Sequence, residues 1–413
     1  MNRTMALLFF FCFLFVGGLF SFFSFQNPYM QLCKEVEKRI YLNHEEIHPW
    51  ITHCYQRASL VTAWTPRQLV INDFKKRAIP ESLSHLDLQE PQEAASFWTG
   101  ESYDHGFFWR YLDQYILITD VTPGSSSDQA GLKPLDLIES FEDHEIHPSY
   151  LNRNGHFTLW RGNERLKVSL QHKPYNRYQS PRAKKIKNSL VLKLNDFFNT
   201  QVVQQSFIKL SSMPVKDKVV LDLRENSGGD FALALQFVNL FICERQKIGE
   251  IRRPKYKNLD KKQFDLRWSQ EEQIEALGSS SILEFITQDN PACIKNPIEI
   301  LISEETASTA ELVAEALRSF RKAKLIGQKT RGSLLVGVAR GVEFLGPGYL
   351  LYVPEAAYYT SRGDLIENQG VSPDLEKHYR LADIKNGEDS YFKLGAKRPN
   401  RPSEAKMRSH SGV

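Results

Sequence analysis

The sequence has little net charge and shows no concentration of basic residues. Its 413 residues include 53 Lys and Arg against 49 Asp and Glu, which gives a formal net charge of +4. The basic residues are scattered rather than gathered in a stripe, so we expect no nucleic-acid partner. Hydrophobic residues make up 41% and charged residues 25% of the chain. Most of the chain can therefore bury a core, and its length suits two or three domains.

Cysteine is also scarce, with five residues in all. No His/Cys cluster has the spacing of metal ligands and no cofactor motif is present, so we expect neither a metal nor another cofactor. Cys12 falls in an apolar N-terminal run. In an oxidising compartment the other four can pair, and Cys33 with Cys54 and Cys243 with Cys293 are plausible local pairs. Four buried free thiols are the alternative, which the sequence leaves open.

Charge is absent from Met5 to Phe25, a run dense in Phe and Leu. Such a run is long enough, as a helix, to cross the roughly 30 Å hydrocarbon core of a membrane. We expect residues 1–26 to be a signal anchor. This predicts a single-pass protein of the cell membrane, held through residues 5–25 and facing the periplasm or cell exterior. A cleaved signal peptide is the alternative, although the run lacks a clear small-x-small cleavage site.

The pattern of residues 27–102 predicts a helical N-terminal region, and it contains no residue that we expect to be catalytic. Candidate helices are Glu35 to Tyr41 and Pro66 to Arg77. Thr65 is a candidate cap for the second, and Pro66 suits its first turn.

The residue pattern changes from 103 to 173, where it predicts β structure. Tyr115 to Ile118 reads as a strand, Asp128 to Leu132 as a short helix stopped by glycine, and 157–170 as a hairpin. The phrase VTPGSSSDQAGLKPLDLIESFEDHEI resembles a PDZ domain. The resemblance implies capture of an extended chain end by strand addition. It assigns the peptide-binding carboxylate loop to His105, Gly106, Phe107 and Phe108. The alternative is a spacer of PDZ shape that binds nothing.

Residues 174–188 are basic, and we expect a solvated linker. Residues 189–376 predict an α/β domain, with a charged, partly helical insertion at 244–297, and residues 377–413 predict a disordered tail. The expected strands are 189–194, 219–223, 298–302, 324–326 and 349–353, in one sheet. The expected helices are 201–210, 230–242 and 309–320.

Three segments of the α/β domain have the residue types of a catalytic site. Asn226-Ser227-Gly228-Gly229 follows a buried strand, and its backbone N–H groups suit an oxyanion hole. Ser308 begins a helix, where free N–H groups favour an oxyanion. Ser-x-x-Glu is also a capping box, so Ser308 as a simple helix cap is the alternative. The third segment, 363–374, is a turn-rich loop after the last strand.

Together these segments resemble the C-terminal-processing (tail-specific) serine peptidases. The quoted matches are VVLDLRENSGGD, ISEETASTAELVAEALR, LIGQKTRG and YYTSRGDLIENQGVSPD, in the family's order. SHLDLQEPQEAASF, before the PDZ-like part, also resembles the family. The resemblance implies a ClpP/crotonase-like peptidase core, with the PDZ domain before it. It implies Ser308 as nucleophile and the N–H groups of Gly229 and Thr309 as the oxyanion hole.

The sequence departs from this family at the general base. Where the family has a catalytic lysine, this chain has Ser333, and Gly337 stands where a glutamine supports that lysine. A serine hydroxyl is a weak nucleophile without an adjacent base. Lys193 and Glu367 resemble in position the histidine and glutamate of tricorn-type peptidases, so a catalytic Ser308, Lys193 and Glu367 is the hypothesis.

Other bases stay open. Lys329 is another amine of the domain, and it lies four positions before the expected lysine. No histidine occurs from 189 to 374, so a Ser-His pair needs His105 or His85.

Two functions remain. The first is an exported serine endopeptidase that cleaves proteins near unstructured C-terminal tails, with proteins or peptides bearing free tails as partners. The second is a peptide-binding pseudopeptidase whose base has been lost.

Overall fold

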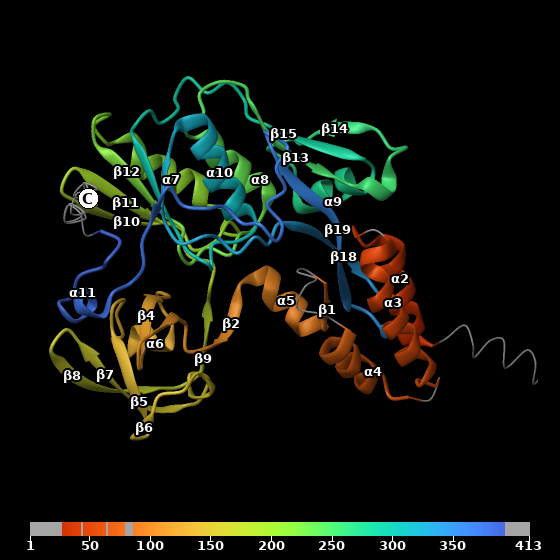
Figure 1. Cartoon of the computed structure of the whole chain (residues 1–413), viewed down its shortest axis with the longest axis horizontal. Helices are drawn as coiled ribbons and strands as arrows, with labels where there is room; N and C mark the ends of the chain where they lie inside the picture. Colours follow the sequence, from red (N-terminus) through yellow and green to blue (C-terminus); the bar gives the residue numbers. More distant parts are fainter. Residues whose placement is uncertain (1–26, 43, 63–64, 79–85, 393–413) are drawn as a thin grey trace, which may run out of the picture.

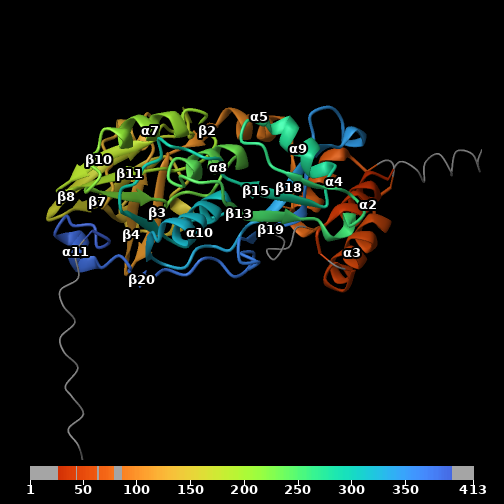
Figure 2. The ribbon, with the colours of Figure 1, turned by 90° about the horizontal axis from the view of Figure 1, so that it is seen from above.

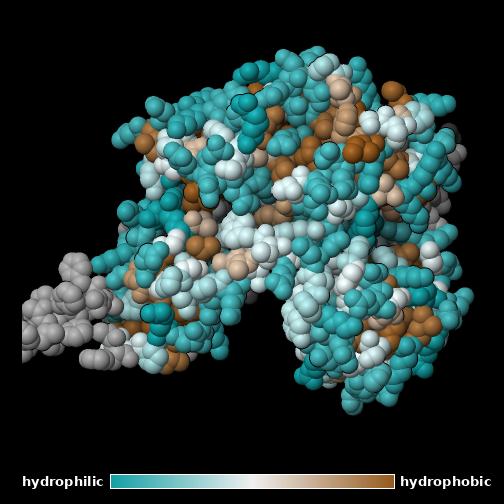
Figure 3. Space-filling view, turned by 180° about the vertical axis from the view of Figure 1, so that it is seen from behind, coloured by the Kyte–Doolittle hydropathy of each residue, from teal (hydrophilic) through white to brown (hydrophobic). Residues whose placement is uncertain are grey.

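The computed structural model describes residues 27–42, 44–62, 65–78 and 86–392. Its largest part is an α/β core, with a small β domain and a group of N-terminal helices on either side of it (Figure 1). Seen from behind, the surface is hollowed between the lobe of the β domain and the lobe of the N-terminal helices (Figure 3).

A mostly parallel sheet forms one layer of the core. Its strand order is β10-β11-β12-β16-β17-β20, and only β10 runs antiparallel to its neighbour. The strands are β10 Arg182–Ile186, β11 Ser189–Lys193, β12 Lys218–Asp222, β16 Ile298–Ile302, β17 Lys324–Gly327 and β20 Leu375–Glu376. The apolar runs predicted four of these strands because parallel strands are covered on both faces.

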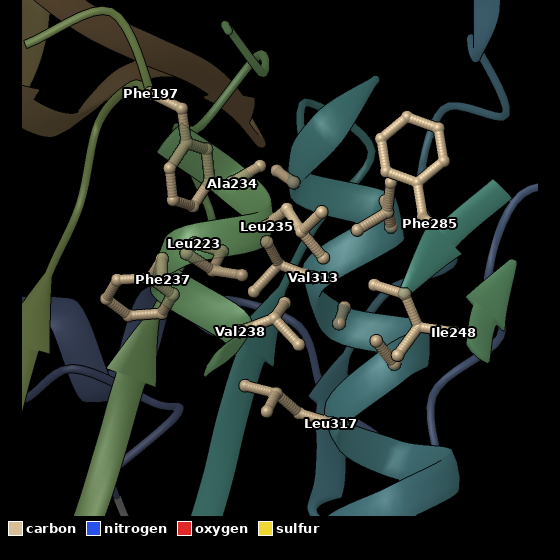
Figure 4. Close-up of a cluster of buried hydrophobic side chains, with 14 of the residues drawn as sticks. Phe197, Leu223, Ala234, Leu235, Phe237, Val238, Ile248, Phe285, Val313 and Leu317 are labelled. Carbon is tan, nitrogen blue, oxygen red and sulfur yellow. The ribbon is translucent and has the colours of Figure 1, made fainter. Parts of the chain in front are cut away.

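The helices of this layer agree with the predicted ones within three residues. They are α7 Val202–Ser211, α8 Phe231–Asn239 and α10 Thr309–Arg321. Side chains of α8 and α10, such as Val238 and Val313, pack between the parallel sheet and a second sheet, which contributes Ile248 and Phe285 (Figure 4). This buried layer fixes the start of α10, where Ser308 lies.

The second sheet differs from the sequence prediction. Its path is β1-β19-β13-β15-β14, and β18 pairs with β19 alone among the described strands. The strands are β1 Asp87–Gln89, β13 Lys247–Arg252, β14 Lys261–Gln263, β15 Ile282–Ile286, β18 Leu335–Gly341 and β19 Leu350–Thr360. The predicted strand 349–353 therefore belongs to this sheet. The insertion 244–297 supplies three of its strands, the 3-10 turn η3 Pro254–Tyr256 and the helix α9 Gln270–Gly278.

The N-terminal helices pack against the second sheet. They are α2 Pro28–Arg39, α3 His44–Ser59, α4 Arg67–Asp73, the π-helix η1 Phe74–Ala78 and α5 Pro91–Thr99. Buried side chains of α2, α3, α4 and η1 join Leu351 and Val353 of β19 in one cluster. Cys33 and Cys54 form a disulfide, and so do Cys243 and Cys293, which confirms both expected pairs.

The β domain, residues 101–176, holds a sheet in the order β3-β4-β5-β7-β8, with β6 on β5. Its strands are β3 Phe107–Leu112, β4 Tyr115–Val121, β5 Leu137–Phe141, β6 His144–Glu145, β7 Gly155–Arg161 and β8 Glu164–Leu170, with α6 Ser126–Gln129 and η2 Pro148–Tyr150. Strands β2 Glu101–Asp104 and β9 Lys173–Asn176 pair with each other and bring its two ends together.

Two predicted boundaries are wrong. The expected linker 174–188 contains most of β9 and all of β10, and β10 pairs along β11. The expected disordered tail contains α11 Leu381–Lys385, and its described residues run to 392. Tyr379 and Tyr391 from this segment pack on the guanidinium of Arg224, and these contacts explain why the segment is ordered.

The 3-10 turn η4 Glu343–Leu345 joins β18 to β19 in the second sheet.

The predicted single-pass location in the cell membrane, facing the periplasm or cell exterior, is corrected. Across the described ranges, no helix combines the length and apolar character needed to span a bilayer. The run 5–25 on which the prediction rested lies outside the described residues.

Candidate active site

Two loops at the carboxyl ends of neighbouring parallel strands are bonded together at the site. The loop after β12 contains Asn226, whose carbonyl accepts a hydrogen bond from the N–H of Ala307 at 3.0 Å. The Asn226 side chain accepts from the N–H of Gly228 at 2.9 Å. In the loop after β16, the hydroxyl of Thr306 donates to the carbonyl of Leu223 at 2.8 Å. These bonds place Ser308 beside the paired glycines, as a site at strand ends requires.

Ser308 has an unusual backbone for a non-glycine residue, with φ 56° and ψ −130°. An ordinary N-cap residue is extended, whereas this conformation costs on the order of 1–3 kcal/mol. Strained residues of this kind concentrate at functional sites, and the nucleophilic serine of α/β-hydrolases lies on a sharp, strained strand-to-helix turn. The backbone thus supports more than a capping role for Ser308.

The amides that face Ser308 come from both loops. A Cβ added to Gly228 would lie 3.0 Å from the Ser308 hydroxyl oxygen, so the hydroxyl is close to the glycine pair. Within the described chain, no atom accepts a hydrogen bond from the N–H of Gly229 or of Thr309. Thr309 is also the first residue of α10, where the helix dipole favours negative charge. The arrangement therefore offers two donors for an oxyanion.

Glu311 connects Ser308 to the turn 330–333. This turn contains Ser333, which stands where the resembling family has its lysine. Its buried carboxylate accepts hydrogen bonds from the N–H groups of Ser308 at 2.9 Å, Gly332 at 2.8 Å and Ser333 at 3.0 Å, and from the hydroxyl of Thr330. Burial raises the pKa of Glu311 above its ordinary value, although these donors oppose the shift. The carboxylate therefore fixes both the start of α10 and the turn 330–333.

Ser308 and Gly229 line the same cavity, whose volume is about 440 Å³. One side of the cavity is formed by residues 335–339 of β18. Because side chains alternate along a strand, five consecutive lining residues mean that the cavity meets the edge of β18 and not one face. This edge is unpaired within the described strands, so an extended chain has room to add to it next to Ser308.

The predicted partners of Ser308 make other contacts. The amine of Lys193 lies 3.2 Å from the Asp120 carboxylate of the β domain. Glu367 accepts hydrogen bonds from the N–H groups of Leu334 at 2.7 Å and Leu335 at 2.9 Å, at the start of β18. A catalytic role for Lys193 and Glu367 therefore stays a prediction.

The other candidate bases, Lys329, His105 and His85, belong to different parts of the chain. Lys329 is exposed and is not part of the cavity lining. His105 is buried in the β domain, where its Nε2 lies 3.0 Å from the carbonyl of Arg153 and burial lowers its pKa. His85 lies outside the described residues.

The four predicted peptide-binding residues come together in the β domain. His105, Gly106, Phe107 and Phe108 line a second cavity of about 390 Å³ along β3. Arg177 also lines it and is exposed, so a cation is available there. β3 is bonded to β4 on one side only within the described sheet, which leaves an edge for strand addition.

Sequence reasoning missed Arg110, which joins this β3 edge to the candidate active site. Its guanidinium donates to Ser303 Oγ at 3.0 Å and to Glu305 at 3.1 Å, in the loop that leads to Ser308. Arg331 pairs with the same Glu305. Arg110 and Glu305 are 195 positions apart, so no local pattern could have paired them.

The strained serine, the two free amides and the neighbouring strand-end loops have the geometry that an acyl-transfer site requires. Residues 188–377 match the model of peptidase family S41. This part of the chain is therefore similar to the S41 peptidases, the family of C-terminal processing peptidases, and the similarity supports a serine peptidase.

Relatives and solved structures agree with this family. A CtpA-like serine protease of Staphylococcus aureus (strain N315) is 27% identical over 364 residues, which cover 79% of this chain and 67% of the relative. Its counterpart in Staphylococcus epidermidis is 23% identical over 350 residues, covering 78% and 66%. The structure of the photosystem II D1 C-terminal processing protease matches with a TM-score of 0.54 at 16% identity, over 85% of this chain and 92% of that one. Mature CPAF complexed with lactacystin matches with a TM-score of 0.52 at 11% identity, over 87% and 95%. At these identities the two structures show the fold.

Proposed function

We propose that this protein is a serine endopeptidase that cleaves proteins or peptides near unstructured C-terminal tails. The observation that carries the proposal is Ser308 in a strained turn, beside the free amides of Gly229 and Thr309, in one cavity with an open strand edge. Two disulfides fit work in an oxidising environment.

The proposed reaction is acyl transfer. The substrate lies as an added strand along β18, and the Ser308 hydroxyl attacks the scissile carbonyl while a base takes its proton. The N–H groups of Gly229 and Thr309 bind the oxyanion that forms. The protonated base gives its proton to the leaving nitrogen, so that collapse releases the new amine and leaves an acyl-serine, which water hydrolyses.

In this proposal the β domain is a PDZ domain that selects the substrate. Its cavity, with His105, Gly106, Phe107 and Phe108, receives the free chain end, and the exposed Arg177 in the same lining supplies a cation for its carboxylate. Arg110 supports a link between this domain and the active site, because its guanidinium contacts the loop before Ser308.

Two observations favour the second candidate, a peptide-binding pseudopeptidase. Ser333 stands where the resembling family has its lysine, and the amine of Lys193 is paired with Asp120. In that case the cavity and the β domain would hold tails without cutting them.

A fluorophosphonate probe separates the two. An activated Ser308 predicts labelling of the wild type and none of Ser308→Ala, with release of products from a peptide bearing a free tail. Absence of labelling and cleavage in a folded wild type that still binds the tail peptide would establish the pseudopeptidase.

The base is identified by the same probe. The panel is Lys193→Ala, Glu367→Gln, Lys329→Ala, His105→Ala and His85→Ala, with Lys295→Ala, at an exposed position outside the cavity lining, as the matched control. The base variant should abolish the pH dependence of the labelling rate between pH 5 and 9, whereas a variant that only perturbs the fold lowers the rate at every pH. An unchanged rate in Lys193→Ala would exclude Lys193.

A further inference from the structure

The insertion 244–297 and the start of α8 together form an apolar wall next to the oxyanion amides. The wall consists of side chains from α8, from α9 and from the strands and loops around them, namely Phe231, Ile251, Phe264, Ile274, Leu277 and Leu283. All six line the cavity that contains Ser308 and Gly229. Seen from above, α5 and α9 both lie along the upper edge of the view (Figure 2), and Phe97 and Trp98 of α5 line the same cavity as this wall.

One face of α9 meets the cavity. Gln270, Gln273, Ile274 and Leu277 all line it, and their spacing is that of a single helix face. The amide of Gln273 donates to the Asp230 carboxylate at 2.8 Å, so its polar group is occupied at the rim. Ile274 and Leu277 lie further along the helix and present only hydrocarbon.

The wall is preformed. Ser269 and Glu272 cap α9 at its start in a reciprocal capping box. Phe264 stacks on Phe285 with ring centroids 4.6 Å apart, and the disulfide between Cys243 and Cys293 closes the insertion at its base. When a substrate side chain binds to a preformed apolar subsite, little of the binding free energy is spent on ordering the protein.

The wall and the oxyanion amides are adjacent in the chain. Gly229 provides the amide and Phe231, two residues later, begins the wall, so their Cα atoms are at most about 7.6 Å apart. In a substrate, the α-carbon of the residue that supplies the scissile carbonyl is bonded directly to the carbonyl carbon. Its side chain is therefore the one that reaches the wall when the carbonyl oxygen reaches Gly229.

Charge in the lining is negative or absent. Asp87 and Asp230 are the acidic members, and no Lys, Arg or His of the described chain lines the cavity. The Asp230 carboxylate already accepts from the N–H of Leu233 at 2.9 Å and from Gln273. An acidic substrate side chain therefore has no counter-ion here.

We infer that this protein cuts after large apolar residues, Leu or Phe, whose side chains are held by the wall of α8 and α9. The inference rests on the proposed function, since it names the specificity of that same site.

The test uses the full chain and a set of peptides that differ only at the residue supplying the scissile carbonyl, which is Leu, Phe, Ala, Lys or Glu. We expect kcat/KM for Leu and Phe to exceed that for Ala by at least about tenfold, because each methylene in an apolar pocket is worth about that factor. Equal or better cleavage after Ala, Lys or Glu overturns the inference.

Variants locate the preference on the wall. Leu277→Trp should fill the subsite and turn the preference toward Ala, and Ile274→Ala, which is milder, should favour Phe over Leu. Glu275→Trp changes a neighbouring exposed residue of α9 that is outside the cavity and should keep the wild-type preference. Wild-type preferences in both wall variants would show that another surface selects the residue.

A binding experiment distinguishes failure of this inference from failure of the proposed function. The same peptides, amidated at the C-terminus so that no free carboxylate takes part, are titrated into Ser308→Ala by fluorescence anisotropy. Tighter binding of the Leu peptide than of the Ala peptide by about tenfold supports the subsite even if the wild type cuts nothing. Equal binding of the two peptides overturns the inference even if the wild type is an active peptidase.

Discussion

Gly228 packs directly against Ser308. A methyl group at Gly228 would lie 2.6 Å from the Cβ of Ser308, closer than two such atoms can approach, and Gly228 has φ 105°. We therefore expect Gly228→Ala to displace the Ser308 hydroxyl. A shift of about 1 Å can cost on the order of 100-fold in rate, and we expect a loss of this size in the rate of fluorophosphonate labelling.

The control for this variant is Gly387→Ala. Gly387 also has a positive φ, 71°, but a Cβ there meets no atom within 4 Å. Both variants should lose some stability through backbone strain, while only Gly228→Ala should lose labelling. Full labelling of Gly228→Ala would contradict the placement of the hydroxyl.

Glu311 offers a second test of the same turn. In Glu311→Gln one carboxylate oxygen becomes an NH2 group that faces hydrogen-bond donors, so two buried donors lose their acceptor. Each costs about 1–3 kcal/mol, and we expect a lower Tm together with slower labelling of Ser308. Circular dichroism melting and the probe measure the two effects.

Glu315→Gln is the matched control, one turn further along α10. Glu315 pairs with Arg318 and Arg362 away from Ser308. We expect a fall in Tm without slower labelling. If Glu311→Gln labels as fast as the wild type, the carboxylate does not position the nucleophile.

The parts that the sequence predicts well are those with a local signal. β12 and β16 are apolar runs that end in turns, and Gly228, Gly229 and Ser308 follow them directly, so periodicity and glycine placement locate the strand ends. The placement of Ser308 beside the glycines then follows from the parallel order of the two strands.

The second sheet lacks such a signal. β13 contains Lys247 and Glu250, which pair with each other and, through Lys247, with Glu284 of β15. These charges satisfy one another across strands, so the segment reads as a polar insertion although it forms a sheet. The cavity wall on α9 could not be predicted either, because the residues that form the rest of the cavity lie far from α9 in the sequence.

The disulfide between Cys243 and Cys293 should stabilise the insertion that forms the cavity wall. It closes a span of 50 residues, for which the loss of the cross-link costs about 4 kcal/mol on a chain-entropy estimate. We expect the double variant Cys243→Ala, Cys293→Ala to expose the insertion to limited proteolysis near α9 while the parallel sheet stays protected. The corresponding pair Cys33→Ala, Cys54→Ala is the control, because it lies among the N-terminal helices. Equal protection of the insertion in both double variants would contradict this role.

Asp120 should make the contact between the β domain and the parallel sheet sensitive to acid. Its buried carboxylate pairs with Arg182 and Lys193 and accepts from Asn195 at 2.7 Å. Burial opposes ionisation, but the two cations outweigh it and hold the pKa of Asp120 below its ordinary value. A depressed folded pKa contributes stability that is present above the ordinary carboxyl pKa of about 4 and is lost as the pH falls through the lower, folded value.

Asp120→Asn removes this contribution and leaves two cations facing an uncharged group. Breaking a buried ion pair costs about 3–5 kcal/mol, and partial exposure of Arg182 at 35% reduces this to roughly 2 kcal/mol. The Tm difference between the wild type and Asp120→Asn should therefore be largest near pH 7 and shrink as the pH is lowered toward 3, measured by calorimetry. Asp143→Asn is the control, since Asp143 is 83% exposed and its Tm difference should stay near zero throughout. A difference for Asp120→Asn that stays constant from pH 7 to 3 would mean that the ionised carboxylate does not hold the two domains together.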